Sequence, residues 1–312
     1  MQEIQSLSIC CPSPNGCINH CKTCTALQYD HIYKNKYDSP CKTDHIEYWS
    51  DVKKRMRYAL SKGCTTLILT GSNEPQQNFK WLETLYNVIQ SLPDPFLNIE
   101  IQTTGAFIDE DYLKFLKGIG VTTLAVSTFN IFDDKKNREI IGCQSEKLCI
   151  QELCDKANEI GLNIRICINV TDQCFVPSID SHNSELFTLP ADQKLKDMAH
   201  SILHRCYRLH ANQVTFRKMW SFPKTEQAKW IDKNTKHSDE FIQYIHYEVQ
   251  EHGTLINYLP YGAGRYDYNG FSIVIDLDCM AKDTTNTNTR YYIIRENGKM
   301  YSSWDSKASL VF

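Results

Sequence analysis

The chain has 312 residues with 34 basic and 37 acidic side chains, a formal net charge of -3 and a hydrophobic fraction of 42%. This composition is typical of a folded globular protein and excludes wholesale disorder and fibrous rods. A near-neutral chain without a dense basic stripe does not fit a protein that grips nucleic acid through its phosphates, so we expect no direct nucleic-acid partner.

The chain is rich in cysteine, with 14 in all. The sequence starts without the basic and apolar segments of a secretion signal, and no apolar run reaches the roughly 18 to 20 residues that span a bilayer. We therefore expect a cytoplasmic protein without membrane contact, in which clustered cysteines indicate metal or redox chemistry. The scattered cysteines 64, 154, 167 and 206 interrupt apolar segments and are predicted to pack in the core.

Hydrophobic periodicity predicts alternating strands and helices over the first two thirds of the chain. Strands are predicted at residues 4–10, 65–70, 97–103, 121–127, 162–170 and 213–216. Helices are predicted at 46–60, 81–89, 111–117, 146–160 and 191–209. The strands are β-branched and alternate little, which predicts a parallel sheet buried on both faces. The predicted fold is therefore α/β, a partial (β/α)6 TIM-like barrel, whose chemistry belongs in the loops after the strands.

The pattern changes after residue 217, which divides the chain into a barrel core at 1–217 and a C-terminal region at 218–312. A helix is predicted at 239–252, and strands at 272–276, 290–295 and 299–303. The last two strands flank Glu296-Asn297-Gly298, a strong hairpin signal. We expect an antiparallel β extension that caps the barrel and shapes the substrate site.

The loop after the first predicted strand carries Cys17, Cys21 and Cys24 in the spacing C-x3-C-x2-C. Three thiolates on a short loop can bind three irons of a cubane cluster and leave the fourth iron open to a small molecule. At this position and spacing the chain resembles the radical S-adenosylmethionine superfamily, over residues 4–217. The sequence TGSNEP at 70–75 is similar to the glycine-acidic motif of that superfamily, and QTTG at 102–105 is similar to a segment that lines the same pocket.

The resemblance implies one 4Fe-4S cluster on the three cysteines, and S-adenosylmethionine as the second cofactor. It implies reductive cleavage of S-adenosylmethionine to a 5'-deoxyadenosyl radical, which abstracts hydrogen from the substrate, and a flavodoxin- or ferredoxin-like electron donor. Members usually carry an aromatic residue before the third cysteine, near the adenine, where this chain has Thr23. No residue is assigned to hydrogen transfer. The residues implied to contact S-adenosylmethionine are Ser72, Asn73, Glu74, Thr103, Thr104, Ser127, Arg165 and Asn169.

Polar and aromatic side chains of the C-terminal part are the candidates for substrate contact. They suit a flat, hydrogen-bonding heterocycle, which binds through aromatic stacking partners and a carboxylate that accepts hydrogen bonds from its donor edge. The expected partner is thus a small molecule that undergoes bond cleavage. These candidates are Arg217, Tyr261, Arg265, Tyr266, Asn269, Asp276 and Asp278.

Several functions remain open at this point. Within the superfamily, the compact single-cluster build resembles queuine lyase, a lyase of 7-deazaguanine salvage. The alternatives are a rearrangement similar to that of 7-carboxy-7-deazaguanine synthase, and a peptide maturase or activating enzyme. Outside the superfamily, the three cysteines could form a structural zinc site with His20, Cys10 or Cys11, in a binding module without catalysis.

Overall fold

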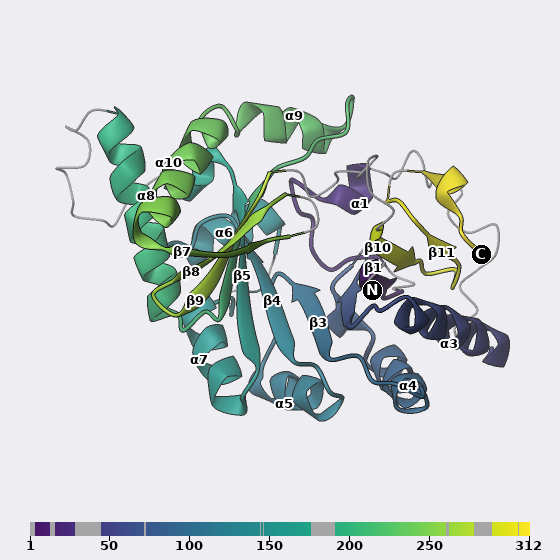
Figure 1. Ribbon diagram of the computed structural model, residues 1–312. Coiled ribbons are helices and arrows are strands. Elements are labelled where there is room, and N and C mark those ends of the chain that lie inside the picture. Colours follow the sequence, from purple (N-terminus) through teal and green to yellow (C-terminus); the bar gives the residue numbers. More distant parts are fainter. Residues whose placement is uncertain are drawn as a thin grey trace.

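The computed structural model describes residues 4–12, 16–28, 45–71, 73–143, 145, 147–175, 191–259, 262–277, 289–304 and 306–312. A single curved sheet crosses the molecule and helices cover its outer face, as Figure 1 shows. The predicted α/β class, with a parallel core and added antiparallel strands, is confirmed. Within the described ranges, no helix has the length and apolar character needed to cross a membrane.

The core of the sheet follows the predicted βα alternation. Its first six strands are parallel and pair in chain order, and each predicted strand is present within a few residues of its expected bounds. They are β1 (Ile4–Cys10), β2 (Thr66–Thr70), β3 (Asn98–Thr103), β4 (Thr123–Thr128), β5 (Asn163–Val170) and β6 (Gln213–Lys218).

The helices of this half are α1 (Thr25–Gln28), α3 (Ile46–Ser61), α4 (Phe79–Gln90), α5 (Glu110–Gly118), α6 (Asp134–Ile141), α7 (Ile150–Ile160) and α8 (Ala191–Arg208). The sequence pattern missed α6 and started the following helix too early, at residue 146. Because α6 is mostly charged and buries few side chains, among them Ile140 and Ile141, its apolar period is too weak to detect.

The C-terminal strands extend both edges of the same sheet, in the order β11-β10-β1-β2-β3-β4-β5-β6-β9-β8-β7. Strand β9 is parallel to β6 and β10 is parallel to β1, whereas β7, β8 and β11 are antiparallel to their neighbours. The predicted hairpin at 290–303 is confirmed as β10 and β11. The additional elements are α9 (Glu226–Lys233), α10 (Ser238–His252), β7 (Thr254–Tyr258), β8 (Gly264–Tyr268), β9 (Phe271–Asp276), β10 (Thr289–Ile294) and β11 (Met300–Tyr301).

The two faces of the parallel strands differ, contrary to the expected burial of apolar residues on both. On β2, for example, Leu67 and Leu69 are buried in the hydrophobic core, while Thr66, Ile68 and Thr70 line an internal cavity. The same period of two places Glu100 and Gln102 of β3 at the cavity. The barrel interior is therefore a cavity of about 1330 Å³, lined by both polar and apolar side chains, rather than a packed core.

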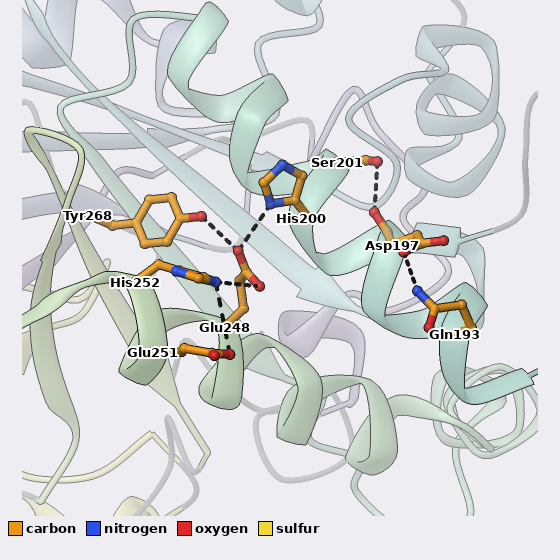
Figure 2. Close-up of polar contacts among 8 residues, drawn as sticks. All are labelled: Gln193, Asp197, His200, Ser201, Glu248, Glu251, His252 and Tyr268. Atoms are coloured by element: carbon orange, nitrogen blue, oxygen red, sulfur yellow. Dashed lines mark hydrogen bonds and ion pairs between the residues drawn. The ribbon is translucent and has the colours of Figure 1, made fainter.

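A polar cluster around Glu248 joins α10 to α8 and β8 (Figure 2). The Glu248 carboxylate is only 4% exposed and accepts hydrogen bonds from the Tyr268 hydroxyl at 2.9 Å and His200 Nδ1 at 3.1 Å. His252 Nε2 lies 3.8 Å from the other carboxylate oxygen. This cluster fixes the C-terminal helix against the outer layer, away from the cavity.

Candidate functional site

The cysteine loop lies between β1 and α1 and is held in place by backbone contacts with the end of α6. The amide of His20 donates to the carbonyl of Ile141 at 3.0 Å, and the amide of Lys22 donates to that of Ile140 at 2.9 Å. Gln77 holds the start of the loop, since its Oε1 accepts from the amide of Ile18 at 3.1 Å. The conformation of the loop therefore depends on α6, the helix that the sequence pattern missed.

The three thiols are half-buried, and Cys21 and Cys24 line the cavity. Burial raises the pKa of the Cys17 and Cys21 thiols, and the amide of Asn19 donates to Cys17 Sγ at 3.4 Å. Thr23, in place of the aromatic residue expected from the resemblance, also lines the cavity. In the part of the chain that is described, no three His, Cys, Asp or Glu side chains are placed around one metal-ion position. The donor set, three half-buried thiols on one loop of which two line the cavity, fits by its chemistry a cluster with three thiolate ligands.

Glu74 lies at the centre of a hydrogen-bonded cage next to this loop. Its carboxylate accepts from Asn19 Nδ2 at 3.0 Å, from the Thr103 hydroxyl at 2.6 Å and from the Thr104 amide at 3.0 Å. Burial raises the pKa of Glu74, and the hydrogen bonds oppose that rise. The cage brings together Glu74, Thr103 and Thr104, which the sequence placed at one pocket.

Two amide oxygens next to Glu74 are buried acceptors in need of a donor. Asn73 uses its Nδ2 to donate to the carbonyl of Cys11 at 2.7 Å, and Asn19 uses its Nδ2 on Glu74 and on the Thr104 hydroxyl. The Oδ1 atoms of both have no partner within the described ranges. Such acceptors fit the amino group of an amino-acid cofactor. The sequence analysis did not include Asn19 among the candidate site residues, although its position inside the cysteine motif could have indicated one. Ser72, which was a candidate, lies outside the described residues.

Further along the sheet, Ser127 and Asn169 line the cavity, as expected for residues at the carboxyl ends of β4 and β5. Arg165 also lines it, but its guanidinium is ion-paired with Glu100. Gln102 Nε2 donates to the same carboxylate at 3.2 Å. Gln102 belongs to the QTTG segment expected at the pocket, whereas Glu100 was missed because we took β3 as apolar on both faces, although its spacing of two residues from Gln102 could have revealed it.

The candidate substrate residues divide into three groups. Arg217, Arg265, Tyr266 and Asp276 line the cavity. The Asp276 carboxylate is paired with Arg290 at 2.9 Å, and the Tyr266 hydroxyl lies 3.3 Å from His246 Nε2. Asn269 is not among the residues that line the cavity: it is exposed in the turn between β8 and β9 and has the positive φ of a tight hairpin, 51°. Tyr261 and Asp278 lie outside the described residues.

The scattered cysteines are in the core as predicted, with Cys64, Cys154, Cys167 and Cys206 each at most 1% exposed. Cys10 and Cys11 are also buried, at the end of β1. The same burial raises the pKa of Cys64 to about 11 and that of Cys154 to about 12, so these thiols are protonated at neutral pH. Most of the additional cysteines of this chain are therefore explained by packing in the hydrophobic core.

No protein-family model matches this chain, and no curated protein matches it. Several solved structures share its fold. Streptococcus suis SuiB bound to S-adenosylmethionine superimposes with a TM-score of 0.58 at 12% identity, covering 97% of this chain and 61% of SuiB. SuiB bound to precursor peptide SuiA gives 0.57 at 14% identity, covering 97% and 60%. The structure of anSMEcpe with bound AdoMet and Cp18Cys peptide gives 0.57 at 13% identity, covering 97% and 75%.

These similarities concern the fold. Over nearly the whole of this chain, the overall fold is shared with SuiB and anSMEcpe. The chain spans about 60% of the length of SuiB.

Proposed function

We propose that this chain is a radical S-adenosylmethionine enzyme that binds one 4Fe-4S cluster through Cys17, Cys21 and Cys24. The observation that carries the proposal is the placement of these cysteines: all three follow β1, and the cavity that Cys21 and Cys24 line is also lined by Glu74. The fold supports the proposal as well, because SuiB and anSMEcpe have a fold similar to that of this chain and were solved with S-adenosylmethionine bound.

The residues of the chain have distinct tasks in this proposal. The thiolates bind iron, and the Glu74 cage with Asn19 and Asn73 receives the amino group of S-adenosylmethionine. The bound cofactors supply a 5'-deoxyadenosyl radical that abstracts hydrogen from the substrate. The walls of the cavity exclude water and hold the substrate in one orientation, which a reactive radical requires. Reduction needs an electron donor of the flavodoxin or ferredoxin type, in the cytoplasm.

For the substrate we propose a small polar molecule, with bond cleavage of the lyase type as in queuine lyase, or a rearrangement like that of 7-carboxy-7-deazaguanine synthase. Polar side chains among the cavity lining, such as those of Arg217, Arg265 and Asp276, support a hydrogen-bonding substrate. A second candidate is a peptide. It is favoured by the volume of the cavity, about 1330 Å³, and by the peptides bound to SuiB and anSMEcpe.

The test is anaerobic reconstitution of the cluster followed by reduction with S-adenosylmethionine present. We expect iron and sulfide in the ratio of a 4Fe-4S cluster, and formation of 5'-deoxyadenosine that is lost in Cys17→Ala, Cys21→Ala and Cys24→Ala. The matched control is Cys64→Ala, because Cys64 is buried in the core and removal of its small side chain leaves the loop intact. Stoichiometric zinc without iron would establish the binding-module alternative and overturn the proposal.

The substrate classes are separated by the same preparation. Consumption of a 7-deazaguanine base, coupled to 5'-deoxyadenosine, would support the lyase or the rearrangement, and product analysis would tell these two apart. Modification of a peptide, with no reaction of the bases, would establish the maturase instead.

A further inference from the structure

Two arginines of the cavity lie on either side of β9. Arg217 on β6 pairs in register with Asp276, and Arg265 on β8 pairs with Val274. Residues paired across neighbouring strands project from the same face, so both arginines reach the cavity that β9 also lines. They are two strand spacings apart, roughly 10 Å along the sheet, a gap that two long side chains can close on one ligand.

The other cations of the cavity wall are neutralised or bound within the protein. Arg165 pairs with Glu100, Arg290 pairs with Asp276 at 2.9 Å, and Lys218 pairs with Asp239 at 2.6 Å. Arg295 donates to the carbonyl oxygens of Ser303 and Trp304, at 2.9 Å each. The cavity wall therefore holds most of its positive charge in internal contacts.

Arg217 and Arg265 differ from these four. Over the described ranges neither guanidinium has a hydrogen bond or an ion pair with the protein, and both residues are half-buried, so that only their Nε atoms are closed off from solvent. An arginine stays charged at any ordinary pH, so both guanidinium groups present a positive charge and free N–H donors to the cavity. The planar fork of each guanidinium matches a carboxylate or a phosphate group in a bidentate contact.

The location of the pair ties it to the cysteine loop. The strand that carries Arg217 continues into the segment at residues 219–222, where the amide of Phe222 donates to Gln28 Oε1 at 2.6 Å. Gln28 ends α1, the helix that follows the cysteines. The two arginines and two of the three thiols, those of Cys21 and Cys24, thus border one continuous cavity.

We propose that Arg217 and Arg265 form an anion-binding subsite that holds a carboxylate or phosphate group of the substrate. The inference rests on the proposed function, because it takes the cavity to be a substrate site. It narrows the substrate class: a molecule without an anionic group would leave both guanidinium groups unpaired.

The subsite is tested by anion binding to the full chain with its cluster reconstituted, independently of turnover. Sodium phosphate and sodium succinate are titrated against sodium chloride at equal ionic strength, by calorimetry and by thermal melting. We expect saturable binding of at least one of the two probes. Phosphate alone indicates a phosphorylated substrate, and succinate alone indicates a carboxylate.

The variants Arg217→Met and Arg265→Met keep most of the side-chain stem and remove the charge. Each should weaken binding at least about tenfold, as loss of a charge-assisted hydrogen bond predicts. Lysine at either position keeps the charge without the fork and should weaken binding less. The matched control is Arg57→Met, which removes an exposed arginine of α3 and should bind as the wild type does.

Folding of the variants is checked by melting without anion. Because neither guanidinium has a partner in the described ranges, the methionine variants lose no contact within the protein, and their melting temperature should be close to that of the wild type. The proposal fails if neither probe binds beyond the chloride control, or if both methionine variants bind as the wild type does. Formation of 5'-deoxyadenosine by the wild type separates the two proposals. If the protein binds the anion but does not cleave S-adenosylmethionine, the proposed function is overturned and the anion subsite stands. If it cleaves S-adenosylmethionine but binds neither anion, the subsite is overturned and the proposed function stands.

Discussion

Gly142 ends α6 in the left-handed conformation, with φ 62° and ψ 32°, directly against the backbone of His20. A Cβ at this position would lie 2.7 Å from the carbonyl oxygen of His20 and 3.0 Å from its carbonyl carbon. His20 stands between Cys17 and Cys21, so this contact couples the end of α6 to the positions of the thiols. Only glycine allows both the left-handed turn and the close approach.

Gly142→Ala should therefore disturb the cysteine loop specifically. The left-handed conformation alone costs an alanine about 1 to 2 kcal/mol, and the overlap with His20 must be relieved by movement of its backbone. We expect a lower melting temperature and a reduced iron content after reconstitution. Gly118→Ala is the matched control, because Gly118 is in α5 with open space around its Cα, and it should keep full iron content. Equal iron content in both variants would show that α6 does not position the loop.

At the scale of elements, α10 is fixed by the buried carboxylate of Glu248, between α8 and β8 (Figure 2). Burial by itself raises the pKa of Glu248, but the hydrogen bonds from His200 and Tyr268 outweigh it and hold the pKa below its usual value of 4.5. A carboxyl group with a lowered pKa in the folded state contributes stability above its unfolded pKa and loses it as the pH falls through the folded value.

Glu248→Gln should consequently lower the free energy of unfolding near neutral pH, and it should lower it by less at acidic pH. Hydrogen bonds to a charged group contribute about 1.5 to 3 kcal/mol, so the difference in unfolding free energy between wild type and variant should be of this order at pH 7. It should shrink as the pH falls below the usual carboxyl pKa, because the wild-type carboxylate gains its proton as the pH falls through its lowered folded-state pKa. Urea denaturation from pH 3.5 to 8 measures it, and a difference that is constant across this range would contradict the assignment.

The elements show what a local pattern can and cannot predict. The strand ends that carry the cysteines and Glu74 were predictable, because β-branched segments between helical periods identify parallel strands and place function after them. The turn at Asn269-Gly270 carried a hairpin signal, but it was masked by the aromatic residues around it, so Asn269 was assigned to substrate. The polar faces of β2 and β3 were missed because we read the strands as apolar on both faces.

At the scale of the molecule, strands β9 and β10 extend opposite edges of the sheet. No local signal in the sequence indicates this, because it depends on which edge each late strand meets. The described parts of β9 and β10 share no backbone pairing, and Asp276 of β9 is joined to Arg290 of β10 by an ion pair of 2.9 Å. This ion pair therefore links β9 to β10 through side chains, and we call the junction between these two strands the seam.

The seam pair should be energetically coupled. Its side chains are only 13% and 23% exposed, so their interaction is screened less than that of a surface pair. A double-mutant cycle with Asp276→Asn and Arg290→Met, measured by urea denaturation, should give a coupling energy of about 1 to 2 kcal/mol, between the values for exposed and buried pairs. The control cycle uses Glu226 and Lys229 of α9, a pair 2.6 Å apart with side chains 81% and 69% exposed, and should give well under 1 kcal/mol. Equal coupling in the two cycles would mean that the seam is held by other contacts.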